Sequence, residues 1–119
     1  IYVAPGVHAN GKFTLGETLA DFGGLQIAYQ AFKEATAGQP QEDKLGFTPD
    51  QRFFLAYSFV WAGNIRDEEI LRRTKTDPHA LGKWRFNGEL PQIDAWYKAF
   101  GITESSPMFI PKEKRVTIW

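Results

Sequence analysis

The chain has 119 residues, of which 43% are hydrophobic and 15% aromatic, so it has the composition of one globular domain and not of a disordered chain. Its 14 basic residues balance its 14 acidic residues, which leaves no positive surplus for a nucleic-acid backbone or an anionic membrane, and no nucleic-acid partner is expected. The absence of cysteine excludes disulfides, thiolate metal ligands and cysteine nucleophiles.

The first third of the chain predicts a loop followed by a helix. Residues 1–14 are rich in proline, glycine and asparagine and predict a loop, with a short extended piece at residues 2–3. Over residues 15–37, apolar side chains recur every three or four positions, which predicts a helix. Gly23 and Gly24 each cost this helix roughly 1 kcal/mol relative to alanine, so a neighbour is expected to approach closely there.

A second helix has a strong start signal. After a loop with glycine and proline, Thr48 is a good capping residue, Pro49 suits the first helical position, and Gln51 completes a capping box. The helix is predicted to run to about Ala62 and to end at Gly63. Because it is apolar on most faces, it is expected to be buried nearly all round.

Two shorter helices are predicted in the remainder. Residues 67–73 are acidic at their start and basic at their end, as the helix dipole favours. Pro91 opens a last helix that Gly101 closes. Residues 74–89 are predicted to be irregular and residues 102–119 to be mostly coil. The predicted fold class is therefore all-α, mainly helical with long loops.

The chain is expected to be a segment of a longer protein. It begins at Ile1 without a methionine, a basic stretch or an apolar signal core. Its most apolar run, residues 53–62, is far shorter than the about 20 residues that span a bilayer, so no transmembrane segment is expected. No repeat or linker divides residues 1–119, which are expected to form one unit.

Glu17 and Asp21 are the first candidate functional residues. They stand one helical turn apart on one face of the first predicted helix. Like charges at this spacing destabilise a helix by about 0.2–0.5 kcal/mol, so a metal cation or a cationic side chain is expected to offset their repulsion. Taken alone, such a pair is more often a solvated acidic edge.

Asp77, His79 and Arg85 form a second cluster. Asp77 is close enough in sequence to accept a hydrogen bond from one ring nitrogen of His79, which would fix the tautomer and raise the basicity of the ring. Arg85 carries a donor fork suited to a carbonyl or a carboxylate. Taken alone, this cluster is more often structural.

The stretches around both clusters closely resemble signatures of the neprilysin family of zinc metallopeptidases. Residues 10–24 read NGKFTLGETLADFGG, where the family has Asn-Gly, Thr-Leu-Gly-Glu-Asn-Ile-Ala-Asp and Gly-Gly. The resemblance continues, in the family's order, through Gln51, residues 53–55, residues 60–61, Gly63, residues 75–79, residues 82–85, Gly88, residues 106–108 and the terminal Trp119. It therefore covers almost the whole chain.

The resemblance implies a role for each candidate residue. Glu17 matches the family's third zinc ligand, and Asp21 matches the carboxylate that holds a zinc-binding histidine. His79, with Asp77 beside it, matches the histidine that stabilises the oxyanion of the tetrahedral intermediate. Arg85 matches the arginine that binds a backbone carbonyl of the substrate peptide.

Two further residues match a substrate pocket, and three positions depart from the family pattern. Val60 and Trp61 match part of the pocket for the side chain after the scissile bond, although both are also plausible core residues of a buried helix. Ala62 replaces a cysteine of the animal enzymes, and Thr18 replaces an asparagine. Pro78 replaces a common valine and could shift how its two neighbours meet.

Half of the family's zinc site is expected to lie upstream of this chain. The family's other two zinc ligands are histidines of a His-Glu-x-x-His helix whose glutamate is the general base. The chain has only His8 and His79, so that helix would precede Ile1. The resemblance thus implies that residues 1–119 are the C-terminal helical part of a thermolysin-like zinc peptidase catalytic domain.

The implied full-length enzyme holds one zinc ion and hydrolyses peptide bonds of oligopeptides through a zinc-bound water. The segment alone, without its upstream part, is expected neither to hold zinc tightly nor to cleave peptides. Residues 115–119 look like the bacterial form, and the family implies an exported, periplasmic or membrane-anchored protein. The alternative function is a non-catalytic helical interaction module, whose mark would be an upstream sequence without His-Glu-x-x-His.

Overall fold

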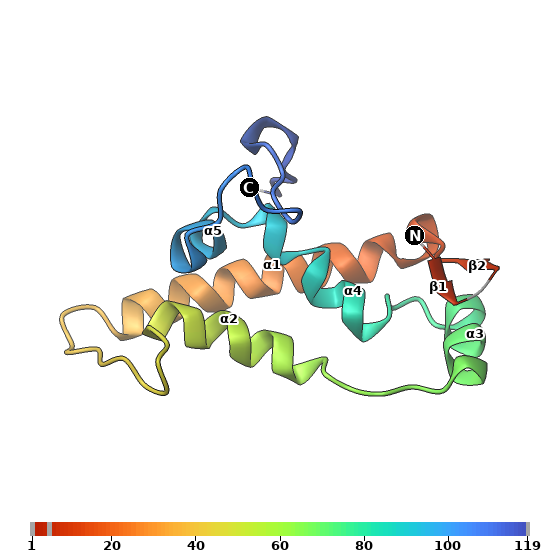
Figure 1. Ribbon diagram of the computed structural model, residues 1–119, viewed down its shortest axis with the longest axis horizontal. Coiled ribbons are helices and arrows are strands. Elements are labelled where there is room, and N and C mark those ends of the chain that lie inside the picture. The colour runs from red at the N-terminus through yellow and green to blue at the C-terminus, as the bar shows by residue number, and fades with distance from the viewer. Residues whose placement is uncertain (1, 5, 119) are drawn as a thin grey trace.

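A computed structural model describes residues 2–4 and 6–118, which are mainly helical, as predicted (Figure 1). A two-stranded antiparallel hairpin precedes the helices. The elements in chain order are β1 (Tyr2–Ala4), β2 (Val7–His8), α1 (Gly11–Ala35), α2 (Pro49–Val60), α3 (Asp67–Thr76), α4 (Gly82–Asn87), the 3-10 helix η1 (Leu90–Gln92), α5 (Asp94–Phe100) and the 3-10 helix η2 (Lys112–Lys114).

Helix α1 is the longest element and begins four residues earlier than predicted. Asn10 caps it, because the Asn10 side chain accepts a hydrogen bond from the backbone N–H of Phe13 at 3.1 Å. The expected loop at residues 11–14 is therefore wrong. Gly23 is buried, but Gly24 faces open space, so the closely approaching neighbour expected at Gly24 is absent from the described residues.

Helix α2 has the predicted start but not the predicted burial. Thr48 and Gln51 form the capping box, and the helix ends at Val60, slightly before the predicted end. Of its side chains only Phe54 is fully buried, whereas Phe59 is 81% exposed and Val60 is 68% exposed. The expectation of burial all round is wrong, because within the described residues only one side of α2 packs against other helices.

The prediction that residues 74–89 are irregular is wrong, because this region contains the whole of α4 and the end of α3. Helix α3 runs on to Thr76, and α4 forms although its N-cap residue, Leu81, makes no side-chain cap hydrogen bond. The start of α4 packs directly on the end of α2: a Cβ added to Gly82 would lie 2.7 Å from the backbone oxygen of Trp61. Tertiary packing, not capping, therefore defines this helix.

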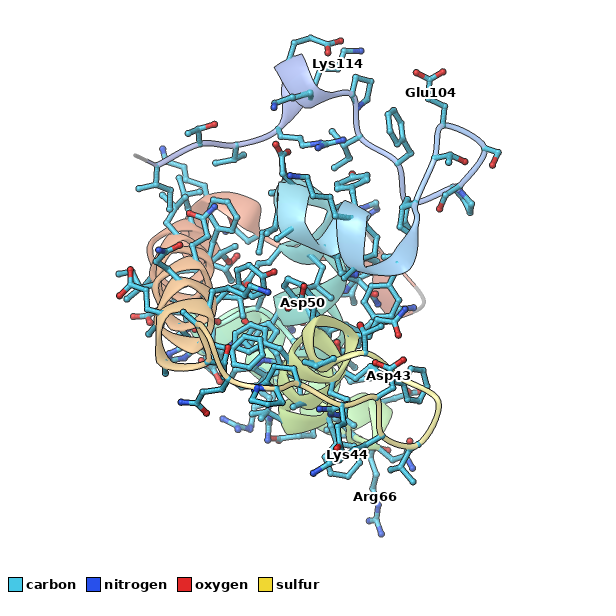
Figure 2. The ribbon with its side chains drawn as sticks, turned by 90° about the vertical axis from the view of Figure 1, so that its left-hand side faces the viewer. Asp43, Lys44, Asp50, Arg66, Glu104 and Lys114 are labelled. Carbon is cyan, nitrogen blue, oxygen red and sulfur yellow. The ribbon has the colours of Figure 1, made fainter. Side chains whose placement is uncertain are left out.

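The core lies where α1, α2 and the η1–α5 segment meet. Figure 2 views the molecule from the end that carries Asp43 and Lys44 and shows α1, α2 and α5 grouped around side chains from all three. The buried hydrophobic residues are Phe22, Leu25, Phe54, Leu90, Ile93, Trp96 and Tyr97. At the margin of this core, Lys33 of α1 pairs with Asp50 of α2 at 3.0 Å.

The C-terminal tail is mostly coil, as predicted, and is attached to α5. The guanidinium of Arg115 lies 3.6 Å from the centre of the Tyr97 ring and donates hydrogen bonds to the carbonyl of Ile110 and to Asp94. Figure 2 shows Glu104 and Lys114 of this tail on the opposite side of α5 from α2. The tail thus closes one side of the core.

Candidate active site

The two carboxylates on α1 each meet a partner from the second half of the chain. Oδ2 of Asp21 accepts a hydrogen bond from Nε of Arg85 at 2.6 Å, across 64 residues of sequence. One turn earlier, Oε2 of Glu17 lies 3.2 Å from Nε2 of His79. Basic side chains therefore offset the repulsion between the two carboxylates. The interpretation of Asp21 as part of a solvated acidic edge is wrong, because its side chain is only 21% exposed.

Asp77 and His79 make the contact that their spacing predicts. Nδ1 of His79 lies 2.7 Å from Oδ1 of Asp77, and the backbone N–H of His79 donates to the same oxygen at 3.0 Å. Pro78 between them does not keep them apart. These two hydrogen bonds, the backbone one first, hold the pKa of Asp77 below its usual value. Because both ring nitrogens face carboxylates, donation at both requires His79 in its doubly protonated form.

Arg85 is held from two directions. Its guanidinium carbon lies 3.7 Å from the centre of the Trp61 ring, and its Nε is bonded to Asp21. Burial alone would lower the pKa of Arg85, but the hydrogen bond and the charge of Asp21 outweigh it and leave that pKa raised. The guanidinium is thus a fixed cation with further N–H donors beyond Nε.

All of the residues that the family resemblance places around the substrate border one groove of about 570 Å³. It lies between the end of α2 and the segment that leads from α3 into α4. Its lining includes Val60, Trp61, Asp77, His79 and Arg85. Since Val60 is largely exposed and lines this groove, the interpretation of Val60 as a core residue is wrong.

Two residues at this site escaped the sequence analysis. The hydroxyl of Tyr57, on α2, lies 2.6 Å from Oε2 of Glu89, which follows α4 and is 2% exposed. Burial, more than the charge of Asp21, raises the pKa of Glu89 to about 7, against the opposing effects of Tyr57 and Arg85. The spacing of four between Arg85 and Glu89 was a signal that could have drawn attention to them.

The residues of this chain fit part of a zinc site. Peptidase zinc sites use three protein ligands. Within residues 2–4 and 6–118, no group of three His, Cys, Asp or Glu side chains could hold a metal ion. Glu17, half exposed, is suited to supply one carboxylate ligand. Trp119, part of the family signature, lies outside the described residues.

Comparison with known proteins identifies the family. Residues 2–116 match Peptidase family M13. The chain is 38% identical to Neprilysin-2 of Caenorhabditis elegans, in a match that covers 88% of this chain and 14% of that protein. It is 35% identical to human Neprilysin, in a match that covers 98% of this chain and 16% of that protein. The inhibitor complex of Mycobacterium tuberculosis zinc metalloprotease Zmp1 is similar in structure, with a TM-score of 0.90 and 38% identity over 94% of this chain and 17% of that one.

The chain therefore belongs to Peptidase family M13, the family that includes the neprilysins. It spans only about one seventh of the length of the curated relatives it matches. In the part of the chain that the structure describes, no helix is both long enough and apolar enough to cross a membrane.

Proposed function

We propose that this chain is the C-terminal part of the catalytic domain of a zinc-dependent endopeptidase that hydrolyses oligopeptides. The observation that carries the proposal is the meeting of four side chains from two distant segments. Glu17 and Asp21 on α1 contact His79 and Arg85, which lie more than 50 residues further along the chain. Membership of the peptidase family and likeness to a solved metalloprotease–inhibitor complex support it.

In this proposal Glu17 holds zinc together with ligands from the upstream part of the domain, and Asp21 supports one of those ligands. Zinc, when bound, acts as a Lewis acid and lowers the pKa of a water molecule to about 7. Asp21 also anchors Arg85 at 2.6 Å, so one carboxylate joins the metal side of the site to the substrate side. Removing such a supporting carboxylate typically changes affinity or activity about 10–100-fold.

His79 and Arg85 act on the peptide. Asp77 holds Nδ1 of His79, so Nε2 faces the side of the site where Glu17 lies, and in the doubly protonated ring its N–H donates to the substrate oxygen that becomes negatively charged. Arg85, fixed by Asp21 and stacked on Trp61, presents its remaining N–H donors to a backbone carbonyl of the substrate. Loss of the His79 donor is expected to lower the rate about 10²–10³-fold.

Val60 and Trp61 supply selectivity at the groove. Both line it beside Arg85, and Val60 is exposed to it. An aliphatic and an indole side chain at this place favour a bulky apolar residue just after the scissile bond. We also propose, from the family, that the intact protein is exported, periplasmic or membrane-anchored in a bacterium.

The test uses the intact enzyme that carries this chain. Glu17→Gln is expected to abolish zinc-dependent cleavage of a fluorogenic oligopeptide and to lower the bound zinc measured by atomic absorption, while circular dichroism stays unchanged. Glu34→Gln is the matched control, since Glu34 is an exposed acid on the same helix, far along α1 from this site. Full activity in Glu17→Gln would refute the ligand assignment.

An intact protein that folds but cleaves no peptide with zinc present would favour the alternative function, a helical interaction module. An upstream sequence without a His-Glu-x-x-His motif would likewise favour the interaction module.

A further inference from the structure

The hydroxyl of Tyr57 lies between two acceptors. It is 2.6 Å from Oε2 of Glu89 and 3.2 Å from the backbone carbonyl oxygen of Arg85. A tyrosine hydroxyl carries one hydrogen. It can therefore donate fully to only one of these oxygens when Glu89 is ionised.

A proton on Glu89 removes this competition. The protonated carboxyl donates its own hydrogen to the Tyr57 oxygen, and the Tyr57 hydroxyl is then free to donate to the Arg85 carbonyl. Both short contacts are satisfied at once in this state. In the ionised state the carboxylate takes the tyrosine hydrogen, because a charged acceptor makes the stronger bond, and the Arg85 carbonyl loses its donor.

The groups around Glu89 include some that favour its protonated form and some that favour its ionised form. Three groups face it: Asp21 from α1, Tyr57 from α2 and Arg85 from α4. Its Oε1 atom is buried without a hydrogen-bond partner among the described residues, which is costly for a carboxylate oxygen and disfavours the charge. Burial raises the pKa of Tyr57 as well, so Tyr57 stays a neutral donor.

The Arg85 carbonyl belongs to α4, the short helix without a side-chain cap that carries the guanidinium. A bond from Tyr57 to this carbonyl ties α4 to α2, the helix that also supplies the Trp61 platform under the guanidinium. An ionised Glu89 would in addition attract the Arg85 cation toward the protein interior. Both effects draw Arg85 away from a substrate.

We propose that Glu89 is a positioning residue for Arg85. When Glu89 is protonated, the Tyr57 hydroxyl is free to bond to the Arg85 carbonyl and hold α4 in place. When Glu89 is ionised, it takes that hydroxyl for itself, and Arg85 binds a peptide substrate less tightly. This rests on the proposed function of Arg85 as the binder of a substrate carbonyl. Peptide affinity then falls as the pH rises through neutrality.

The test measures the pH profile of KM in the intact zinc-loaded enzyme with a fluorogenic oligopeptide. In the unmodified enzyme, KM is expected to rise about three- to tenfold from pH 6 to pH 8, with little change in kcat, which is the size of one neutral hydrogen bond. Glu89→Gln is expected to keep the low KM throughout, because its amide N–H donates to Tyr57 at every pH.

Tyr57→Phe is the second variant and Tyr97→Phe the control. Without the hydroxyl, Tyr57→Phe is expected to show a raised KM already at pH 6 and a smaller step than the unmodified enzyme, because only the charge of Glu89 still acts on Arg85. Tyr97 is another buried tyrosine, bonded to the carbonyl of Pro91 and the N–H of Ile110. Tyr97→Phe is expected to lower stability but to keep the step, so general loosening of the fold is separated from loss of the positioning contact.

Infrared spectroscopy of the same proteins separates this inference from the proposed function. A protonated carboxyl band that disappears as the pH rises past 7, and that is missing in Glu89→Gln, is expected. If the enzyme cleaves peptides but Glu89→Gln keeps the KM step, or if the carboxyl band is absent at pH 6, the inference is refuted and the proposed function stands. If no peptide is cleaved, the proposed function fails, and with it the link from Glu89 to substrate, even where the band titrates.

Discussion

Among the ion pairs of the described residues, the one between Asp21 and Arg85 differs in that both of its side chains are largely buried. The side chains are 21% and 16% exposed, and the guanidinium is covered on one face by Trp61. Exposed pairs contribute about 0–1 kcal/mol, because water screens them, whereas breaking a buried pair leaves an uncompensated charge at a cost of about 3–5 kcal/mol. The partly exposed Asp21–Arg85 pair falls between these limits.

A double-mutant cycle measures this pair. We expect Asp21→Asn or Arg85→Gln alone to lower the free energy of unfolding by about 1–3 kcal/mol, and the double variant to cost less than the two together. Urea unfolding of the intact protein is the measurement. Lys33→Met, which breaks the exposed pair with Asp50, is the control and is expected to cost under about 1 kcal/mol. Equal effects at both pairs would contradict the role of burial.

Because Glu89 is buried, the protein is expected to lose stability as the pH rises toward neutrality. Its pKa is about 7 in the folded protein and about 4.5 when exposed, so between these values the folded state holds a proton that the unfolded chain has released. The free energy of unfolding therefore falls as the pH rises through this window, by up to about 3 kcal/mol. The contribution is complete below pH 4.5 and lost above pH 7.

Glu89→Gln should flatten this part of the profile and be the more stable protein at pH 8, which urea unfolding at several pH values tests. Asp77, whose pKa is lowered, acts at lower pH and with the opposite sign, since its contribution is lost as the pH falls. A profile for Glu89→Gln that parallels the unmodified protein between pH 4.5 and 7 would disprove the assignment.

At the scale of elements, α4 shows how neighbours create a helix that its own sequence barely favours. It has six residues, a leucine at its N-cap and a glycine at each end. Gly82 lets its first turn approach the backbone of Trp61, and a Cβ on Gly88 would lie 2.8 Å from the backbone oxygen of Trp84. This close approach sets Arg85 over the indole ring of Trp61.

Gly82→Ala is expected to displace α4 from the end of α2. A methyl group 2.7 Å from a backbone oxygen cannot be accommodated by moving a flexible side chain, so a cost of about 1–3 kcal/mol is expected. In the intact enzyme KM should rise as Arg85 moves. Lys83→Ala, at the next and exposed position, is the control and should stay within about 0.5 kcal/mol. Unchanged melting temperature and KM in Gly82→Ala would show that α4 tolerates the shift.

At the scale of the whole molecule, the chain is more open than a free-standing domain of its size. Its radius of gyration is 15.9 Å, against about 13.5 Å expected for this length. Its accessible surface is 8165 Å², about 1,600 Å² more than a monomer of this mass usually exposes. That excess is roughly twice the area that each partner buries in a standard protein interface, which is about 800 Å². It supports the proposal that further parts of a catalytic domain cover this segment.

The exposed apolar residues show where such a cover is needed. Most of them lie along the first turns of α1 and the second half of α2, next to the candidate site, and on the loop between these helices. They include Phe13, Leu15, Leu19, Leu45, Phe47, Leu55, Phe59 and Val60. An apolar surface of this extent favours association when it is left open to water.

Residues 1–119 produced alone are therefore expected to self-associate, and analytical ultracentrifugation checks this. They are also expected to show no submicromolar zinc site by titration, because Glu17 is a single ligand. The intact protein is the control and should bind zinc tightly. A monomeric segment with a submicromolar zinc site would contradict both the open surface and the divided metal site.

Much of this architecture follows from local sequence, because the signals are local interactions. The capping box of Thr48 and Gln51 needs only residues three apart, and Gly101 adopts the positive φ of 61° that ends α5. The contact between Asp77 and His79 likewise spans two residues. The family resemblance added the grouping of Glu17, Asp21, His79 and Arg85, and their roles in zinc and substrate binding stay predictions.

Other features depend on which segments meet, and no local pattern contains that. Gln51 also donates to the carbonyl of Ala99 at the end of α5, a contact across 48 residues. The existence of α4, the exposure of the last turn of α2 and the burial of Glu89 against Tyr57 are of the same kind.

The sequence by itself thus determined the helical class, the starts of α2 and α3 and the two acidic and basic clusters, since caps, periodicity and spacing act over a few residues. Only the tertiary structure decided that Asp21 holds Arg85 over Trp61 and that a buried acid lies behind them, because desolvation and long-range pairing arise when distant segments pack together.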